Sequence, residues 1–273
     1  MRDFDNVLVT GGAGFIGSHL VSELLKNNFK LRVLDNLLTG SLENIKSHIG
    51  NPNFHFINGD LRNKKTLNEA LKDVKVVCHL AAISSVPFSI KNPEETFQIN
   101  VDGTKNLLEL SAHNDVERLI FASSSAVYGD PIYLPIDEYH PVNPKSPYAL
   151  SKLEAEQKCM ELEEKYGLKV VILRLFNIYG PCNRHDYSGV ITQFINRLRN
   201  SRPLLIYGDG TQTRDFVYIK DAVQAFIAAL NGGFAYEDAP IFNIGTGKPT
   251  SINDLARILM DLIGRETKLE YLS

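Results

Sequence analysis

The stretch Asn6-Val-Leu-Val-Thr-Gly-Gly-Ala-Gly-Phe-Ile-Gly17 decides the fold of this chain. An apolar run comes first, glycines follow, and Ser18–Lys26 continues with apolar residues at helical spacing. This order predicts a strand, a tight turn and a helix. Glycine at such a turn permits an unusual φ angle, a close approach of a pyrophosphate, and close packing of helix and strand. Because the free amides of a helix N-terminus attract phosphates, we predict a dinucleotide site rather than a purely structural turn.

The composition is that of a globular chain without a nucleic-acid footprint. Of 273 residues, 44% are hydrophobic and 22% are charged, which suits a chain with a sizeable core. The net charge of −3 and the lack of a Lys/Arg cluster argue against nucleic acid as a partner. The first residues carry no signal-peptide run, and no segment is long and apolar enough to span a membrane. We therefore expect a cytoplasmic protein without membrane association.

The cysteines and histidines indicate neither a disulfide nor a metal site. Cys78, Cys159 and Cys182 are far apart, odd in number and outside any CxxC pair, so we expect reduced thiols. The seven histidines show no HxxxH or HxH spacing, and we expect no bound metal.

Acidic residues follow two of the predicted strands. Lys30–Leu34 is the second strand and leads directly to Asp35. A carboxylate at this point can accept two hydrogen bonds from an adenosine ribose, which favours NAD over NADP. Residues 36–40 contain no arginine to bind a 2′-phosphate, and this favours the same cofactor. Asp60, after the third strand, is placed to meet the adenine amino group. The alternative for Asp35 is a solvated residue in a loop.

Strands and helices alternate along the first half of the chain. We predict further strands at Phe54–Asn58, Val74–Leu80 and Arg118–Ala122, and a long helix at Pro93–His113. Such alternation predicts an α/β fold with a parallel, doubly wound sheet and ligands at the carboxyl ends of its strands. The mostly small residues of 81–85 would let the backbone approach a cofactor there.

The second half is less regular. Ser146 and Pro147 begin a strong helix that ends at Tyr166, because serine caps a helix and proline suits its first position. The other predicted elements are extended segments at Lys169–Leu175, Leu204–Tyr207, Thr213–Tyr218 and Ile241–Ile244, helices at Val190–Asn200, Asp221–Leu230 and Ser251–Ile263, and a loop at Asn177–Asn183. With no obvious linker, we expect a dinucleotide-binding domain at 1–176 and 216–240 and a smaller, interleaved α/β subdomain for substrate at 177–215 and 241–273.

Tyr148 and Lys152 are four residues apart on the predicted helix and therefore share a face. A tyrosine is a poor base at neutral pH because its usual pKa is about 10. A nearby ammonium and a nicotinamide cation both favour the phenolate and bring it toward the range for proton transfer. Ser124, just past the fifth predicted strand, could bond the same substrate hydroxyl. The pair alone could be a surface contact, but its order after the glycine turn, Asp35 and Ser124 predicts an active site.

Six motifs together carry a family resemblance. They are Thr10-Gly-Gly-Ala-Gly-Phe-Ile-Gly17, His79-Leu-Ala-Ala82, Ser123-Ser-Ser-Ala-Val-Tyr-Gly129, Pro147-Tyr-Ala-Leu-Ser-Lys152, Leu173-Arg-Leu-Phe-Asn-Ile-Tyr-Gly-Pro181 and Arg214-Asp-Phe-Val-Tyr218. With these motifs the chain resembles the extended short-chain dehydrogenase/reductase family, and within it the nucleotide-sugar 4-epimerases of UDP-glucose or UDP-N-acetylglucosamine. The resemblance covers essentially the whole chain and implies a Rossmann fold, bound NAD and a UDP-sugar substrate.

The resemblance also implies the catalytic roles. In the similar enzymes, a tyrosine takes the proton of the sugar 4-hydroxyl while hydride passes from C4 to NAD, and the hydride then returns to the other face of the 4-keto sugar. Tyr148 would be this base, Lys152 its electrostatic partner and a ribose ligand, and Ser124 the hydroxyl that orients the sugar. Ser124 is preferred to Ser123 or Ser125 because its spacing from the following tyrosine matches the family.

The remaining site residues are likewise implied by the resemblance. The cofactor would be bound by Gly11, Gly14, Phe15, Ile16, Gly17, Asp35, Asn36, Asp60, Leu61, Leu80, Ala81, Ala82, Asn100, Tyr148 and Lys152. The substrate would be bound by Ser85, Ser124, Tyr148, Asn177, Val190, Tyr207 and Arg214. The charge of Arg214 suits two phosphates, and its alternative is an ion pair with Asp209 or Asp215.

Two positions narrow the reaction. The related sugar 4,6-dehydratases carry an Asp-Glu pair where this chain has Ser125 and Ala126, and decarboxylating relatives tend to have a glutamate at the second position. Epimerisation needs one proton moved reversibly and fits this inventory. We therefore expect a UDP-hexose 4-epimerase. The alternatives are a UDP-glucuronate 4-epimerase or decarboxylase, and a non-catalytic NAD-binding member of the family.

Two further expectations follow from the resemblance. Family members continue past the position of Ser273 through an Arg-x-Gly-Asp-like segment that supplies a second phosphate-binding arginine and part of the sugar pocket. We therefore expect either a shortened chain or a more open site, and the identity of the sugar stays open. The helices Pro93–His113 and Ser146–Tyr166 resemble those that pair in family dimers, which implies a homodimer, although apolar helix faces more often belong to the core.

Overall fold

The computed structural model describes residues 6–181, 189–232 and 241–272, so Cys182 lies outside the described residues. The chain divides into two compact units. The larger unit comprises Met1–Leu175 and Lys220–Ile244, and the smaller one comprises Phe176–Ile219 and Gly245–Ser273.

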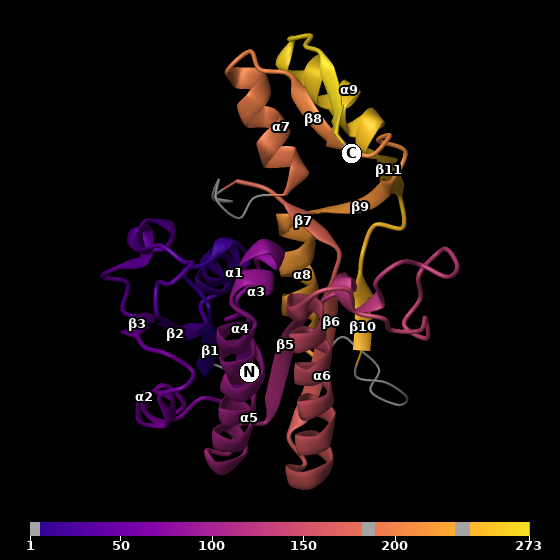
Figure 1. The fold of residues 1–273 in the computed structure, drawn as a ribbon. Coiled ribbons are helices and arrows are strands. Elements are labelled where there is room, and N and C mark those ends of the chain that lie inside the picture. The colour runs from indigo at the N-terminus through magenta and orange to yellow at the C-terminus, as the bar shows by residue number, and fades with distance from the viewer. Residues whose placement is uncertain (1–5, 182–188, 233–240, 273) are drawn as a thin grey trace. The chain divides into compact units, whose positions relative to one another are not determined.

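The larger unit is built on one parallel sheet (Figure 1). Its strands are β1 (Asn6–Thr10), β2 (Lys30–Asp35), β3 (Phe54–Asn58), β4 (Val76–His79), β5 (Arg118–Ser124), β6 (Lys169–Leu175) and β10 (Ile241–Ile244). They follow the order β10-β6-β5-β4-β1-β2-β3, and every neighbouring pair is parallel. This confirms the doubly wound α/β fold. The strand order reverses between β1 and β4, and such a point is where doubly wound sheets bind ligands.

Helices cover both faces of this sheet. They are α1 (Phe15–Lys26), α2 (Lys64–Ala70), α3 (Val86–Lys91), α4 (Pro93–Phe97), α5 (Gly103–His113), α6 (Pro147–Tyr166) and α8 (Ile219–Leu230), joined by 3-10 turns at Leu42–Asn44, Lys46–His48 and Ser125–Tyr128. One core cluster packs α2, α5 and α6 on the sheet through Leu67, Leu107, Cys159, Phe121 and Ile172. Figure 1 shows α5 and α6 in front of the sheet.

The helix α6 begins and ends as the sequence predicts. The Ser146 hydroxyl accepts a hydrogen bond from the amide of Ala149, at 3.1 Å, and Pro147 occupies the first turn. Gly167 ends the helix in the left-handed conformation, with φ of 72°. The cap and the stop together fix the register of the face that carries Tyr148 and Lys152.

The segment Pro93–His113 differs from the single α-helix that its sequence predicts. A π-helical turn at Gln98–Asp102 separates α4 from α5. The buried residues of this turn are Ile99, Asn100 and Val101. A π turn shifts the helical phase and often lies at a functional position, and here it coincides with Asn100. Hydrophobic periodicity does not resolve such a local shift.

In its described residues, the smaller unit contains two short sheets and two helices. Its elements are β7 (Asn177–Tyr179), α7 (Val190–Arg199), β8 (Leu204–Tyr207), β9 (Thr213–Tyr218), β11 (Pro249–Ser251), α9 (Ile252–Ile263) and β12 (Leu269–Leu272). The sheets have the orders β11-β9-β7 and β12-β8. Phe194, Leu198, Ile206, Leu255 and Leu259 form part of its core.

Three local expectations were wrong. The predicted loop at Asn177–Asn183 begins with β7, which pairs with β9, because a three-residue strand is too short to show a period. β5 continues through Ser124, which pairs with Leu175 instead of lying past the strand. The strand Ile241–Ile244 pairs with β6, whereas the sequence grouped it with the smaller part.

Within the described residues, no helix combines the length and the apolarity needed to cross a membrane.

Candidate functional site

The glycine turn after β1 leaves room for a ligand and brings β1 and β4 together. Gly11 has a φ of 71°, and a Cβ atom there would lie 2.6 Å from the amide nitrogen of Ala81. A Cβ on Gly17 would overlap the carbonyl oxygen of Gly11. On Gly14, which caps α1, a Cβ would meet only the Gly11 oxygen among the described residues, at 3.1 Å. Gly11 thus allows the positive φ of the turn, Gly17 lets the helix pack closely on the turn, and Gly14 leaves open space for a ligand.

Phe15 and Ile16 form the first turn of α1 behind this opening, and both are half-buried. Their backbone amides belong to the unbonded N-terminal end of the helix, which attracts anions. The backbone here therefore suits a pyrophosphate.

Asp35 ends β2 and lies against the glycine turn. Its Oδ2 atom accepts a hydrogen bond from the amide of Ala13 at 2.9 Å, and Oδ1 accepts one from the amide of Leu37 at 2.8 Å. Burial raises the pKa of this carboxyl, and the two backbone hydrogen bonds oppose the rise. A buried carboxylate at the end of the second strand is not a solvated loop residue, so the alternative for Asp35 is wrong.

Asp60 belongs to a polar cluster beyond β3. It accepts hydrogen bonds from Arg62, at 2.9 and 2.8 Å, and from Nδ2 of Asn36, at 2.8 Å. The Arg62 guanidinium lowers the pKa of Asp60 to about 2. Leu61, the next residue, is buried under Gly103 of α5. The structure thus brings together Asn36 and Asp60, which are expected from the sequence to bind the same cofactor.

The end of β4 contains a residue that the sequence did not single out for a role. The His79 ring lies between the hydroxyls of Thr10, 2.7 Å from Nδ1, and Thr104, 2.8 Å from Nε2. Burial, aided by the charge of Lys152, lowers the pKa of His79 to about 3. A histidine in the otherwise apolar run of β4 was the available signal. His79 joins β1, β4 and α5 directly beneath the segment of Leu80, Ala81 and Ala82.

Asn100 fixes the segment after β4. Its Oδ1 atom accepts from the amide of Ile83 at 2.8 Å, and its Nδ2 atom donates to the carbonyl of Ile83 and to the hydroxyl of Ser151, both at 2.9 Å. Ser85 ends this segment and caps α3 by accepting from the amide of Phe88 at 3.2 Å. Asn100 thus fixes the backbone at Ile83, and the Ser85 hydroxyl caps a helix.

Ser124 and Tyr148 lie together. A hydrogen bond with the Ser124 hydroxyl lowers the pKa of Tyr148, although burial outweighs it and leaves that pKa raised. The Ser124 oxygen also accepts from the amide of Ala126 at 3.2 Å, and the Tyr148 amide donates to Ser89 at 3.1 Å. Ser123 points elsewhere, into the core, where it donates to Glu156. This geometry supports the choice of Ser124 over Ser123.

Lys152 is buried beside the end of β5. Its Nζ atom donates to the carbonyl of Ala122 at 2.8 Å and lies 4.7 Å from the centroid of the Phe121 ring. Burial lowers its pKa to about 8, and Cys159 and Glu156 act in the opposite direction. The ammonium therefore bonds to the strand that carries Ser124.

The candidate substrate residues of the smaller unit are spread over its elements. Asn177 donates to the carbonyl of Asp215 at 2.9 Å, which joins β7 to β9. Val190 begins α7 and is half-buried, and Tyr207 at the end of β8 is 67% exposed.

Arg214 is exposed on β9, where its Nη1 atom donates to the carbonyl of Thr213 at 2.8 Å. The expected alternative, an ion pair with Asp209 or Asp215, is wrong within the described part of the chain. Asp209 accepts from Thr211, and Asp215 accepts from the amides of residues 246 and 247. The guanidinium is therefore available to an anionic ligand.

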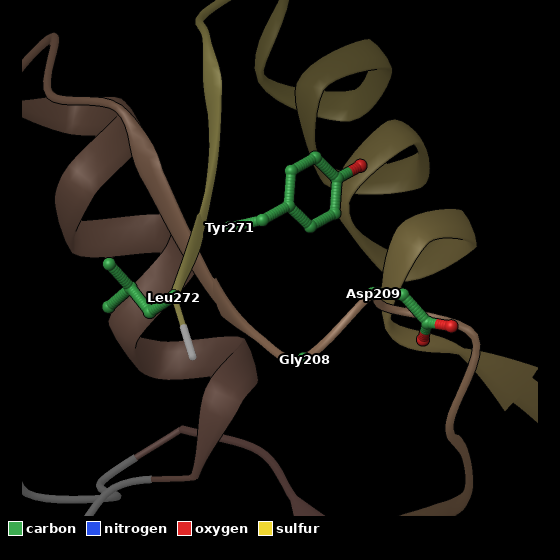
Figure 2. Close-up of a pocket in the computed structure, with 4 residues that line it drawn as sticks. All are labelled: Gly208, Asp209, Tyr271 and Leu272. Carbon is green, nitrogen blue, oxygen red and sulfur yellow. The ribbon is translucent and has the colours of Figure 1, made fainter.

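One open pocket of the smaller unit has a volume of about 500 Å³. It is lined by Gly208, Asp209, Tyr271 and Leu272 (Figure 2). The Tyr271 phenol donates to Asn253 at 3.1 Å, and the Gly208 amide donates to the carbonyl of Leu272 at 2.8 Å. The first bond joins β12 to α9, and the second holds the end of β8, which carries Tyr207, against β12.

Residues 7–245 match a family model described as the NAD dependent epimerase/dehydratase family. The chain belongs to this family. A relative from Methanocaldococcus jannaschii, provisionally named a UDP-glucose 4-epimerase, is 47% identical over 264 residues, which are 94% of this chain and 82% of the relative.

Solved structures of the family are also similar. A UDP-N-acetylglucosamine 4-epimerase from Methanobrevibacter ruminantium, in complex with UDP-N-acetylmuramic acid, has 38% identity and a TM-score of 0.92, over 100% of this chain and 86% of that one. A UDP-glucuronic acid 4-epimerase from Bacillus cereus, with UDP-glucuronic acid and NAD, has 35% identity and a TM-score of 0.89, over 98% and 86%.

Other relatives in the family carry different reaction names. They include UDP-glucuronic acid decarboxylases and dTDP-D-glucose 4,6-dehydratases, at 32% to 39% identity. The chain spans 63% of the length of the Xenopus tropicalis decarboxylase. Family membership confirms the Rossmann-like fold, an enzyme of the epimerase type and NAD as the cofactor. The chain's own residues fit NAD, because the glycine turn is open at Gly14 and Asp35 ends β2.

Proposed function

We propose that this chain is a UDP-hexose 4-epimerase, which inverts C4 of UDP-glucose and UDP-galactose or of their N-acetyl forms. The observation that supports it is the hydrogen bond of Ser124 with Tyr148 beside a strand end that lacks a carboxyl group at Ser125 and Ala126. One hydroxyl to orient and one phenol to move a proton are sufficient for a reversible oxidation at a carbinol carbon. Elimination of water would require an additional acid–base group.

The chain's own residues would divide the work as follows. Ser124 binds the sugar 4-hydroxyl and orients it toward Tyr148. Tyr148 takes the proton and later returns it. Lys152 favours the phenolate by its charge, since burial of the phenol acts against ionisation. Bound NAD would supply hydride acceptance and return. Because no net redox change occurs, the cofactor can stay bound between turnovers.

The smaller unit would bind the nucleotide. Arg214, with no carboxylate partner among the described residues, has the charge and geometry to bind a diphosphate. Asn177, Val190 and Tyr207 are proposed to complete this site. The second candidate function is 4-epimerisation or decarboxylation of UDP-glucuronate, which is favoured by the similarity to the Bacillus cereus enzyme.

A substrate panel tests the proposal. The protein is incubated separately with UDP-galactose, UDP-N-acetylgalactosamine and UDP-glucuronate, first without and then with added NAD, and products are identified by NMR. We expect inversion at C4 of one of the first two. Conversion of UDP-glucuronate alone would establish the second candidate. An absence of turnover in every mixture would contradict both.

We also propose a homodimer in the cytoplasm. The exposed apolar residues Leu150, Met160 and Tyr166 lie on α6, one of the helices implied in family dimers. Cys78 and Cys159 are buried free thiols, as in a reducing compartment. A molecular mass of one chain, measured by light scattering, would contradict the proposed dimer. Recovery of the protein in a membrane fraction would contradict the proposed cytoplasmic location.

A further inference from the structure

A buried ion pair lies next to the candidate catalytic residues. Glu156 on α6 and Arg174 on β6 share two hydrogen bonds, from Nε to Oε1 at 3.0 Å and from Nη2 to Oε2 at 2.7 Å. Their side chains are 1% and 5% exposed. Desolvation of two buried charges offsets most of their attraction, and apolar side chains of similar size often stabilise a core equally well. Stability alone therefore does not explain the pair.

Glu156 joins α6 to the end of β5. Its Oε1 atom accepts a hydrogen bond from the Ser123 hydroxyl. One turn earlier on the same face of α6, Lys152 donates to the carbonyl of Ala122. The two residues that precede Ser124 are thus both bonded to the helix whose first turn carries the proposed base. These bonds set the separation between the end of β5 and the start of α6.

Arg174 holds the segment that follows Ser124. Its Nη1 atom donates to the phenol oxygen of Tyr128 at 2.9 Å, and its guanidinium lies 4.8 Å from the centroid of that ring. Tyr128 ends the 3-10 turn that begins at Ser125, and its phenol donates to Asn243 on β10 at 2.7 Å. Ser124 is therefore fixed along the chain from both sides by one connected network.

We propose that Glu156 and Arg174 are positioning residues, which hold Ser124 and Tyr148 next to each other through β5 and α6. The inference rests on the proposed function, because the pair acts through the two groups assigned to proton transfer. Neither of its members is assigned to substrate or cofactor. A displacement of about 1 Å in a catalytic group can cost roughly 100-fold in rate, so a rigid connection between strand and helix has a large kinetic effect.

The Glu156 carboxylate also acts on the charge of Lys152. That ammonium interacts with Glu156 and Cys159 on its own helix and with the His79 ring on β4. Loss of the Glu156 charge removes an interaction that raises the pKa of Lys152, so the ammonium loses its proton at lower pH. If the ammonium favours the Tyr148 phenolate, the high-pH limit of turnover then moves to lower pH.

Three full-chain variants test the inference with NAD and the UDP-sugar that the unmodified protein converts. Ser123→Ala removes the bond between Glu156 and β5 and keeps the ion pair. Glu156→Gln removes the charge. Glu164→Gln, at an exposed position of α6, is the matched control. The measurements are kcat, KM, the pH profile of kcat and the midpoint of thermal unfolding.

We expect Ser123→Ala to lower kcat about tenfold or more with little change in KM, because geometry rather than binding is lost. Glu156→Gln should move the high-pH limit of kcat to lower pH, which a purely structural defect would not do. The control should change neither quantity. Folded Ser123→Ala and Glu156→Gln proteins with the unmodified kcat and pH profile would overturn the inference. If Glu156→Gln does not fold, the kcat of Ser123→Ala alone tests the inference.

A titration of the Tyr148 phenol tests the positioning role independently of the proposed function. The ultraviolet absorbance titration of each protein, minus that of its Tyr148→Phe counterpart, reports the pKa of this phenol. Since the Ser124 hydrogen bond lowers that pKa, a loosened contact in Ser123→Ala should raise it. A protein that converts no UDP-sugar but shows this shift contradicts the proposed function and retains the positioning pair. An unchanged titration in folded Ser123→Ala contradicts the pair itself.

Discussion

The ammonium of Lys152 donates a 2.8 Å hydrogen bond to the carbonyl oxygen of Ala122, although its residue is only 4% exposed. Burial lowers the pKa of this group to about 8. A charge placed in the core opposes folding, while the proposed mechanism uses the same charge to favour the Tyr148 phenolate. Stability and chemistry are therefore in conflict at this residue.

Lys152→Met should stabilise the fold and abolish turnover. The pKa of Lys152 is about 8 when folded against 10.5 for the free group, so the unfolded chain binds more protons between these values. The buried ammonium lowers the free energy of unfolding by an amount on the order of 3 kcal/mol below pH 8, and this loss shrinks as the pH rises toward 10.5. Urea unfolding at pH 7 should show a gain of roughly 1–3 kcal/mol, which shrinks at higher pH. Exposed Lys105→Met is the control, and an equal gain in both variants would contradict the assignment.

Tyr148→Phe should lower turnover by roughly 10²–10⁴-fold, because it removes the proposed acid–base group and keeps the ring. Binding of NAD and of UDP should be retained, as measured by calorimetry. Tyr166→Phe, at an exposed position near the end of the same helix, should leave the rate unchanged. Near-normal turnover in Tyr148→Phe would remove this residue from the assigned role.

Gly11→Ala should abolish NAD binding, and Gly50→Ala should not. Both glycines have positive φ, at 71° and 93°, so an alanine at either position is strained by about 1–3 kcal/mol. At Gly11 the added Cβ would also lie 2.6 Å from the amide of Ala81, whereas at Gly50 no described atom lies within 4 Å. The difference between the variants therefore measures the approach of β1 to β4. Equal loss of unfolding free energy and equal NAD affinity would show that this approach is unimportant.

Purified protein should carry nicotinamide nucleotide, because a reaction that returns its hydride leaves the cofactor as NAD after each cycle. The nucleotide released by acid denaturation can be quantified by chromatography. Asp35→Ala removes the carboxylate that accepts from the Ala13 amide, and this variant should be purified with less nucleotide. A cofactor-free protein with weak affinity for NAD would contradict tight retention, while leaving the family assignment intact.

The sequence predicted the parts of the fold that depend on local pattern. The glycine turn, the cap at Ser146 and the buried strands each have a periodicity or a residue type that a single segment reveals. The doubly wound order then follows from their alternation. β7 and β11 could not be foreseen, because three-residue strands have no period and form only against β9.

The candidate site was predictable in its residues and less so in its contacts. Ser124, Tyr148 and Lys152 follow from spacing and resemblance, but the four-residue spacing does not show that the Lys152 ammonium turns to β5. Glu156 and Arg174 are far apart in sequence, and only the pairing of β5 with β6 and the packing of α6 bring them together. Arg174, as an arginine in an otherwise apolar strand, indicated a buried polar contact, but the sequence did not show that Glu156 is its partner.

His79 should make the fold sensitive to acid. Its folded pKa of about 3 lies below the free value of 6.5, so the unfolded chain binds the extra proton as the pH falls through 6.5. The neutral ring contributes stability that is fully present above that value and is lost progressively toward pH 3. Between pH 7.5 and pH 5 the loss from this group is about 2 kcal/mol.

Urea unfolding of the unmodified protein, His79→Asn and His55→Asn at these two pH values isolates the effect. The asparagine removes the titration at the cost of the hydrogen bonds to Thr10 and Thr104, so His79→Asn should be less stable at pH 7.5 and lose less stability on acidification. Exposed His55→Asn should follow the unmodified protein. If His79→Asn loses as much stability between the two pH values as the unmodified protein does, the buried ring is not the acid-sensitive group, and the carboxylates of the native fold must account for the loss.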